Sequence, residues 1–302
     1  MKKSIFLVSG ILILFSSSFR PAPGTHDPRD ESLPVKYEEL TSPDFIRAVG
    51  QSRGTCIIPL GILEKHGPHL PLGTDLLVAR EMALRAAGKE YTVVFPEYFV
   101  GQIFEARHQP GTVAYSHGTM WNLLEETCSE LARNGMKKII LVNGHGGNNA
   151  FLQYFCQAQL AARKDYCVVV FDPHEDPAVM EKVEQLRKFP WDSHAGDLET
   201  GMMLNVRPDL VHVDRAGEQS GADQARLSNI PNGYTGIWWY ARYPNHYAGD
   251  ATDPSREAAA LLLEHHIELL AELVRTLKQN DDILELQDRF FQEAERPIDT
   301  KQ

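Results

Sequence analysis

Length, composition and charge limit what this chain can be. Its 302 residues are 43% hydrophobic and 24% charged, a balance typical of globular proteins with an apolar core. Collagen-like, mucin-like and largely disordered chains are therefore excluded. Lysine and arginine total 30 and aspartate and glutamate total 41, so the formal net charge is −11. Because such a field repels phosphate backbones and anionic lipids, we expect no nucleic acid partner.

The N-terminus has the features of a signal peptide. Lys2 and Lys3 precede an apolar run over residues 4–15, which is shorter than the ~20 residues that a membrane-spanning helix needs. The sequence therefore predicts a signal peptide over residues 1–20 and a polar, proline-rich linker over residues 21–35. The mature protein would be exported, either periplasmic or extracellular, with no membrane attachment. An uncleaved N-terminal anchor is the alternative, because no clear cleavage site follows the run.

The elements that follow alternate short β-branched runs with longer amphipathic ones. Apolar runs without alternation are typical of strands buried on both faces, and helices between them supply the crossovers that parallel strands require. This pattern predicts one α/β domain over residues 36–302, with a mostly parallel central sheet and the last long helix packed on its outside. The predicted strands cover residues 55–60, 92–95, 137–142 and 167–171, and the predicted helices cover residues 76–87, 120–133, 149–164 and 258–278.

The four cysteines lie within predicted strands or helices and not in a loop framework. A buried free cysteine packs as a small hydrophobic residue, so we predict core thiols at Cys56, Cys128, Cys156 and Cys167. Export would permit disulfides, and Cys156 with Cys167 is the one pairing that merits a test.

The first candidate site follows the first predicted strand. The loop over residues 61–75 carries Glu64, His66, His69 and Asp75. It lies at the carboxyl edge of the predicted sheet, where open parallel sheets bind their ligands. Carboxylate and imidazole ligands suit Zn²⁺, Mn²⁺ or Fe²⁺. A polar surface loop in which Asp75 only caps the next helix is the alternative, but other feature-rich loops fall on the same edge.

A glycine-rich stretch, NGHGGNN over residues 143–149, follows the third predicted strand. Its glycines allow a close approach of the backbone, and the helix that begins there favours an anion. A phosphate site is the weaker interpretation, because the stretch lacks a P-loop lysine and the GxGxxG spacing. His145 is therefore a candidate metal ligand.

A third block runs over residues 191–201 and leads into an apolar helix. His194 and Glu199 could be a general acid/base and a ligand, or a helix cap and a solvated carboxylate. Spacing alone does not decide between these. The aromatic run Trp238, Trp239 and Tyr240 could line a substrate pocket, form a subunit contact or pack in the core.

Three blocks of this sequence resemble the creatininase (creatinine amidohydrolase) family. They are the stretch from Glu64 to Asp75, similar to E-x-H-G-x-H-x-P-x-x-T-D, the NGHGGN of residues 143–148, and the HAGxxET of residues 194–200. Their order and intervals fit the family across about residues 36–275. Weaker similarities are Pro110-Gly111-Thr112 and Gly249-Asp250-Ala251-Thr252.

The resemblance implies a three-layer α/β/α domain that hydrolyses a non-peptide or unusual C–N bond in a small-molecule amide. It also implies one or two divalent metal ions per subunit, with zinc expected first and manganese or iron as alternatives. A homo-oligomer follows from the family too, commonly a hexamer.

The resemblance also implies roles for individual residues. Glu64, Asp75 and His145 would hold one metal ion, and His66 with Asp75 would reach a second. His194 matches the family histidine assigned to proton transfer. Trp191 resembles an aromatic residue that closes over the substrate, although its spacing to the histidine is one residue shorter here.

One position departs from creatininase itself, which has a glutamate ligand two residues after the histidine of NGH. This sequence has Gly147 there. We expect Glu199 to supply the missing carboxylate, with a single-metal enzyme as the alternative. The departure points away from creatinine and toward the broader branch of the family that includes formamide and peptide amidases.

The mechanism expected from these residues is attack by metal-activated water on a carbonyl, with His194 protonating the leaving nitrogen. The sequence has no GxSxG motif that would supply a serine nucleophile. Two other classes remain: a non-catalytic exported protein that binds a metal or ligand, and a metallophosphatase. The latter favours cationic side chains near the metal, and the three blocks contain only Lys65.

Overall fold

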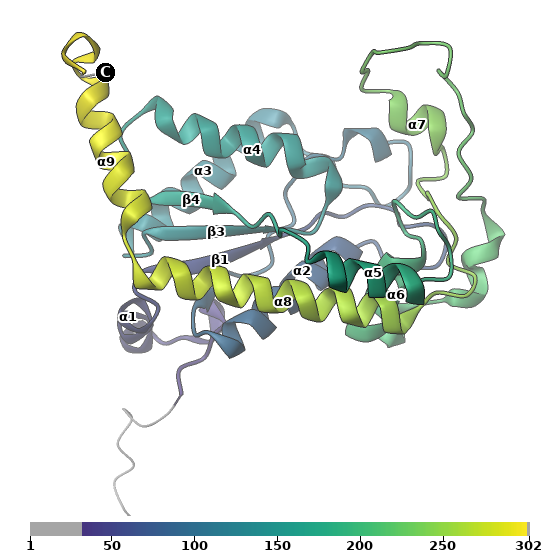
Figure 1. Cartoon of the computed structure of the whole chain (residues 1–302), viewed down its shortest axis with the longest axis horizontal. Helices are drawn as coiled ribbons and strands as arrows, with labels where there is room; N and C mark the ends of the chain where they lie inside the picture. The colour runs from purple at the N-terminus through teal and green to yellow at the C-terminus, as the bar shows by residue number, and fades with distance from the viewer. Residues whose placement is uncertain (1–31, 301–302) are drawn as a thin grey trace, which may run out of the picture. The chain divides into compact units, whose positions relative to one another are not determined.

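A four-stranded parallel sheet forms the centre of this computed structural model, which describes residues 32–300 (Figure 1). The predicted signal peptide and residues 21–31 of the predicted linker lie outside the described residues. The strand order is β2-β1-β3-β4, and every neighbouring pair is parallel. The strands are β1 (Thr55–Leu60), β2 (Val93–Val94), β3 (Lys138–Asn143) and β4 (Cys167–Val170). The predicted parallel sheet is therefore confirmed, with β2 reduced to two residues.

Helices cover both faces of the sheet (Figure 1). The helices of the described chain are α1 (Ser42–Gln51), α2 (Thr74–Lys89), α3 (His117–Arg133), α4 (Asn149–Ala158), α5 (Pro177–Leu186), α6 (Asp197–Val206), α7 (Trp238–Arg242), α8 (Arg256–Gln279) and α9 (Asp282–Ala294). Because successive strand residues point to opposite faces, Ile58 packs with residues of α1, α3 and α4, whereas Ile57 packs with α2 and α8. This is the predicted three-layer α/β/α architecture.

The long C-terminal helix α8 packs on the sheet as predicted. Leu263, Ile267 and Leu270 form one cluster with Ile140 of β3, and all four side chains are at most 1% exposed. None of the helices among residues 32–300 is both long enough and apolar enough to span a bilayer. The helix predicted over residues 149–164 is shorter than expected, because α4 ends at Ala158 and a 3₁₀ turn follows.

The cysteines are free thiols, as predicted. Cys56, Cys128 and Cys167 are buried and Cys156 is half-buried, and no disulfide joins Cys156 to Cys167. Burial raises the pKa of the Cys128 thiol to about 12, which makes it a poor nucleophile.

The carboxyl ends of the strands point toward the side of the molecule that carries α7, and α9 lies at the opposite side (Figure 1). Residues 207–255, between α6 and α8, contain one short α-helix, α7, two 3₁₀ helices and several turns. We call residues 219–249 of this stretch the α7 excursion.

Candidate metal centre

Two glycines bring the first turn of α2 against the ends of β1 and β3. A Cβ atom at Gly61 would lie 2.3 Å from the backbone of Leu76, and one at Gly144 would lie 2.4 Å from the carbonyl oxygen of Asp75. A side chain at either position would therefore force the helix away. The close approach places Asp75, in the first turn of α2, beside the loops that carry Glu64 and His145.

The structure brings together the four ligands expected from the first two blocks. Nε2 of His66 lies 2.9 Å from Oδ1 of Asp75 and 3.8 Å from Oε1 of Glu64. Nδ1 of His145 lies 2.9 Å from Oε1 of Glu64 and 3.2 Å from Oδ2 of Asp75. All four side chains are at most 7% exposed. Residues separated by 81 positions in the chain thus form one buried cluster.

The third block approaches the same cluster from α6 and the loop before it. An antiparallel bridge between His194 and Ala248 holds this loop. The rings of His194 and His66 lie 4.3 Å apart, and Nδ1 of His194 lies 3.7 Å from Oε2 of Glu199. Ligand atoms of His66, His194 and Glu199 lie within 4.8 Å of one another. Glu199, in the first turn of α6, therefore lies beside the cluster.

Unsatisfied polar atoms indicate that this cluster suits a cation. Oε1 of Glu64, Oδ2 of Asp75 and Nε2 of His145 are buried and have no hydrogen-bond partner among residues 32–300. Burying carboxylate oxygens without partners is costly unless a cation or a donor satisfies them. Two such oxygens beside imidazole nitrogens match the donor set that zinc, manganese and iron prefer.

The same proximity shifts the pKa values of the cluster. Burial alone would lower the pKa of His66, but Asp75 and Glu64 outweigh it and raise this pKa to about 10. Burial likewise disfavours protonated His145, yet Glu64 and Asp75 raise its pKa well above the usual range. A metal ion would therefore compete with protons for these imidazoles.

His194 and Glu199 are shifted in the opposite sense. Burial, helped by the charge of His66, lowers the pKa of His194 to about 3, so this imidazole is neutral near pH 7. Its Nε2 lies 3.0 Å from the carbonyl oxygen of Lys65. Because a carbonyl only accepts, Nε2 carries the hydrogen and Nδ1 keeps its lone pair. Burial raises the pKa of Glu199 to about 7.

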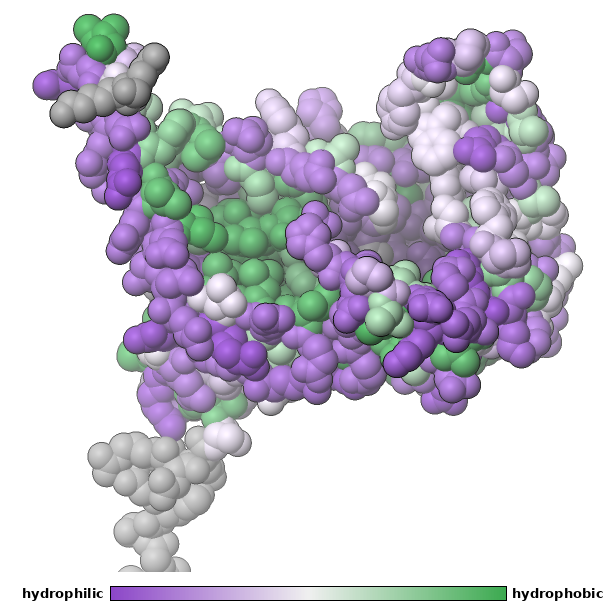
Figure 2. All heavy atoms as spheres, in the orientation of Figure 1, coloured by the Kyte–Doolittle hydropathy of each residue, from purple (hydrophilic) through white to green (hydrophobic). Residues whose placement is uncertain are grey.

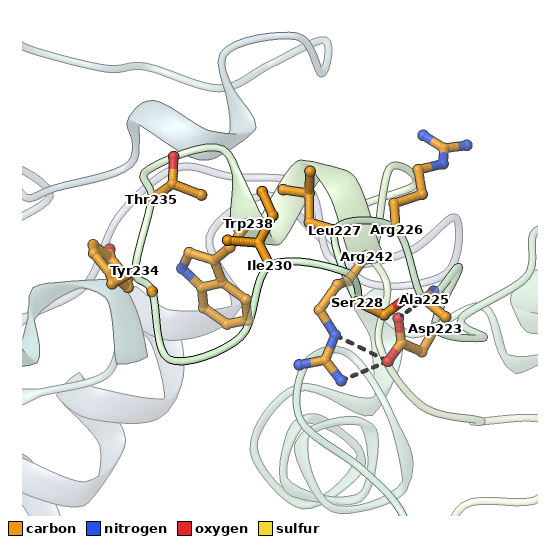
Figure 3. Close-up of a pocket in the computed structure, with 11 residues that line it drawn as sticks. Asp223, Ala225, Arg226, Leu227, Ser228, Ile230, Tyr234, Thr235, Trp238 and Arg242 are labelled. Atoms are coloured by element: carbon orange, nitrogen blue, oxygen red, sulfur yellow. Dashed lines mark hydrogen bonds and ion pairs between the residues drawn. The ribbon is translucent and has the colours of Figure 1, made fainter.

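A cavity of about 670 Å³ opens beside the His145 loop. It is lined by Gly147, by Glu105 and Arg107 from the loop before α3, and by Trp238 and Tyr240 of α7. A second cavity, of about 540 Å³, lies within the α7 excursion (Figure 3). Trp238 lines both cavities, and Arg242 donates hydrogen bonds to Asp223 at the edge of the second.

The structure explains why a glycine fits at position 147. A Cβ atom there would lie 2.4 Å from Nε2 of His145 and 2.9 Å from Oε1 of Glu105. The carboxylate of Glu105 thus approaches the space that a side chain at position 147 would enter. Glu105 was not predicted as a site residue, and no motif in the sequence singles it out.

Trp191, the expected substrate contact, and two further histidines make contacts outside the cluster. Trp191 stacks at 5.6 Å from Tyr243 and lines a separate cavity of about 460 Å³. Nε2 of His69 lies 2.9 Å from the hydroxyl oxygen of Thr200, and burial lowers the pKa of His69 to about 4. His108 bonds to the carbonyl oxygen of Pro244 at 2.9 Å.

Sequence reasoning also missed His246, which is 2% exposed and hydrogen-bonds through Nε2 to Oε2 of Glu64. The only local signal is its position three residues before Gly249, in one of the weaker similarities. Trp239, from the predicted aromatic run, hydrogen-bonds to His246 at 2.9 Å. This tryptophan is therefore part of the site's surroundings, whereas Trp238 and Tyr240 line a cavity.

Comparisons with known proteins agree with this geometry. A family model described as creatininase (creatinine amidohydrolase) matches residues 38–274. The creatinine amidohydrolase of Pseudomonas putida is 29% identical over 259 residues, covering 81% of this chain and 97% of that protein. The mycofactocin precursor peptide peptidase of Mycolicibacterium smegmatis is 31% identical over 164 residues, covering 52% of this chain and 60% of the peptidase.

A crystal structure of creatininase superimposes with a TM-score of 0.69 at 25% identity, covering 83% of this chain and 100% of that one. The two relatives named above are an amidohydrolase and a peptidase, and the buried cluster of this chain fits a divalent cation. These findings place the chain among the metal-dependent hydrolases that act on C–N bonds. The chain belongs to the creatininase family.

Proposed function

We propose that this protein is an exported amidohydrolase that cleaves a non-peptide or cyclic amide C–N bond by attack of metal-activated water. The observation that carries the proposal is the convergence of Glu64, His66, Asp75 and His145 in one buried cluster. Related proteins are named for creatinine, for a precursor peptide and, in Methanothermus fervidus, for a formylamino pyrimidine, and each of these contains an amide-type C–N bond.

In this proposal each residue has a defined task. A divalent cation held by Glu64, Asp75 and His145, with a second reached by His66 and Asp75, would activate water and polarise the substrate carbonyl. His194, neutral with its Nδ1 lone pair free, can take a proton and deliver it to the leaving nitrogen. The carbonyl of Lys65 fixes this tautomer by accepting from Nε2.

We propose zinc as the resident metal, with manganese or iron as alternatives. Two structural relatives at 26% identity and TM-score 0.68 are described as a manganese creatininase and as a variant creatininase of Zn-Zn type. Glu199 is the proposed carboxylate of a second ion, which His66 and Asp75 would also reach, and its ligand atom lies within 4.8 Å of that of His66. If Glu199 does not bind metal, one ion per subunit is expected.

The cavity favours a substrate larger than creatinine. Its volume of about 670 Å³ falls within the range of drug-sized ligand pockets, and its walls combine Trp238 and Tyr240 with the opposite charges of Glu105 and Arg107. Gly147 supports the same proposal, since creatininase itself has a glutamate there. We therefore propose a formamide, lactam or cyclic ureide with an apolar or aromatic part. We also propose that Trp191 contacts the substrate, as the family resemblance implies.

The experiment is a metal analysis of the purified protein, followed by a screen for ammonia or amine release from cyclic ureides, lactams and formamides. We expect bound metal and release from at least one class, abolished in Glu64→Gln. Tight metal binding without any turnover would instead indicate a non-catalytic binding protein. Hydrolysis of p-nitrophenyl phosphate alone would indicate a metallophosphatase, with Arg107 as the nearby cation.

Export and domain organisation are further parts of the proposal. We propose a signal peptide over residues 1–20 and one domain over residues 36–302; from Leu33 onward the described residues group into one unit. N-terminal sequencing of the mature protein checks this, because a start near residue 20 is expected. A mature chain that begins at Met1 would contradict it.

We also propose a homo-oligomer, with a hexamer as the expected form. Apolar side chains gather between α4, α8 and α9, over the edge strand β4 (Figure 2). Ile283, Leu286 and Phe290 of α9 are 39%, 59% and 43% exposed. Exposed edge strands and apolar patches are commonly covered by another protein chain. This face is therefore suited to contact with a second copy of the same chain. Light scattering should give a multiple of the subunit mass, which is 34.0 kDa for all 302 residues and lower once the proposed signal peptide is removed, and a monomer mass would contradict the proposal.

A further inference from the structure

A short chain of hydrogen bonds connects the α7 excursion to the metal cluster. His246, in the excursion, places Nε2 against Oε2 of Glu64. On the other side of the ring, the indole Nε1 of Trp239 lies 2.9 Å from Nδ1 of His246. The side chain of His246 is 2% exposed, so water has little access to either contact.

These two contacts determine the tautomer of His246. An indole N–H can only donate, so Nδ1 of His246 must accept and carries no hydrogen. In a neutral imidazole the other nitrogen then holds the hydrogen, and Nε2 donates it to Glu64. A doubly protonated ring would bring two donors together at Trp239.

The tautomer separates His246 from the ligands around it. Ligand atoms of Glu64, His194 and His246 lie within 4.8 Å of one another, so distance alone would make all three a metal site. A ligating nitrogen needs a free lone pair, and Nε2 of His246 has none. His194 differs, because its Nε2 donates to Lys65 and its Nδ1 stays free.

We propose that His246 is a positioning residue that raises metal affinity through Glu64. By holding Oε2, it leaves Oε1 facing Nδ1 of His145 at 2.9 Å, where no other residue of the described chain satisfies that oxygen. Trp239 acts one step further out, because its N–H keeps His246 in the donating tautomer. Partners of this kind are typically worth 10–100-fold in metal affinity. This inference concerns metal affinity and holds for any substrate.

The backbone at His246 provides a matched pair of variants with opposite expectations. Its φ of +51° lies in the left-handed region, which asparagine tolerates better than glutamine. The amide nitrogen of a glutamine side chain reaches about as far as Nε2 and can donate to Glu64. A shorter asparagine reaches only about as far as Nδ1. Backbone preference therefore favours His246→Asn, whereas the proposed hydrogen bond favours His246→Gln.

The test measures zinc affinity by chelator competition on the purified full-length chain, with no substrate present. We expect zinc to bind 10–100-fold more weakly to His246→Asn and within about threefold of wild type to His246→Gln. Trp239→Phe, which keeps a ring but loses the donor, should weaken binding by about three- to tenfold. Equal loss in both His246 variants, or loss in neither, would overturn the proposal.

A spectroscopic measurement on the wild-type protein does not depend on how the variants fold. Nitrogen-15 NMR of labelled histidine should show His246 with Nε2 protonated and Nδ1 unprotonated, both before and after zinc is added. A zinc-bound Nε2 would make His246 a ligand and contradict the proposal. Because neither measurement uses a substrate, a negative amide screen would count against the proposed function and leave this inference standing.

Discussion

The loops after β1 and β3 and the α7 excursion both reach Glu64, but they are built in different ways. In the loops, Gly61 and Gly144 leave room for the first turn of α2, which places Asp75 beside Glu64 and His145, and these glycines are close to both residues in the sequence. The excursion delivers His246 through contacts to distant residues, such as the hydrogen bond from the Gly67 amide to the His246 carbonyl at 3.2 Å. The proposed ligands thus come from the loops after β1 and β3 and from the first turn of α2, whereas the residue proposed to orient Glu64 comes from an irregular segment.

The largest expected effect comes from the loop region. Glu64→Gln keeps the shape of the side chain but removes the negative charge that faces the imidazoles of His145 and His246 and would bind the cation. Zinc affinity should fall by at least about 100-fold, since a ligand matters more than an orienting partner. Chelator competition measures this, with Glu105→Gln as a matched control whose affinity should change far less. Normal zinc binding by Glu64→Gln would refute the assignment of Glu64 as a ligand.

The next effect separates proton transfer from metal binding. His194→Ala should lower kcat at least tenfold, within the ~10²–10⁴-fold that such groups usually supply, while metal content stays near normal. Steady-state kinetics and metal analysis on the same preparation measure both quantities. Loss of metal together with activity would show that Nδ1 of His194 is a ligand.

A pair of adjacent glycines tests how tightly the His145 loop is packed. Gly147→Ala would place a methyl group 2.4 Å from Nε2 of His145, whereas Gly146→Ala would meet nothing within 4 Å. We expect zinc affinity to fall about tenfold in the first and to stay near wild type in the second. Titration of the two purified variants with zinc distinguishes them, and equal affinities would show that His145 does not depend on this space.

The last prediction concerns the pH dependence of metal binding and needs no substitution. The pKa of His66 is raised to about 10 and that of His145 is also raised, so both imidazoles are protonated near pH 7 until metal displaces the protons. Zinc binding should therefore release protons and weaken about 10–100-fold per unit as pH falls from 8 to 7. Calorimetry in buffers of different ionisation enthalpy measures the release. Binding with no proton change would contradict these shifts.

The sequence was sufficient for the sheet and for the proximity of the candidate ligands beside its strands. Strands with unbroken apolar runs, such as Thr55–Leu60, and ligands that directly follow them are local features, and the structure matches both. Strand β2 is shorter than predicted because only Val93 and Val94 keep the pairing with β1. The approach of Glu199 could be expected only from the family resemblance.

The contributions of His246, Glu105 and the 3₁₀ turn after α4 could not be predicted. His246 lies 182 residues from Glu64, and no periodicity or spacing relates positions so far apart. Its tautomer depends on the indole N–H of Trp239. The sequence is equally compatible with a Trp239 side chain that packs in the core. Glu105 is connected to the site only through its contact with the space that a side chain at Gly147 would occupy, and no sequence pattern reveals that contact.

The most direct test is a crystal structure of the zinc-loaded protein with anomalous data collected at the zinc edge. We expect an anomalous peak about 2.0–2.2 Å from carboxylate oxygens of Glu64 and Asp75 and from imidazole nitrogens of His145 or His66. Nε2 of His246 should stay bonded to Glu64. A peak elsewhere, or none at a zinc concentration that saturates the protein, would contradict the account.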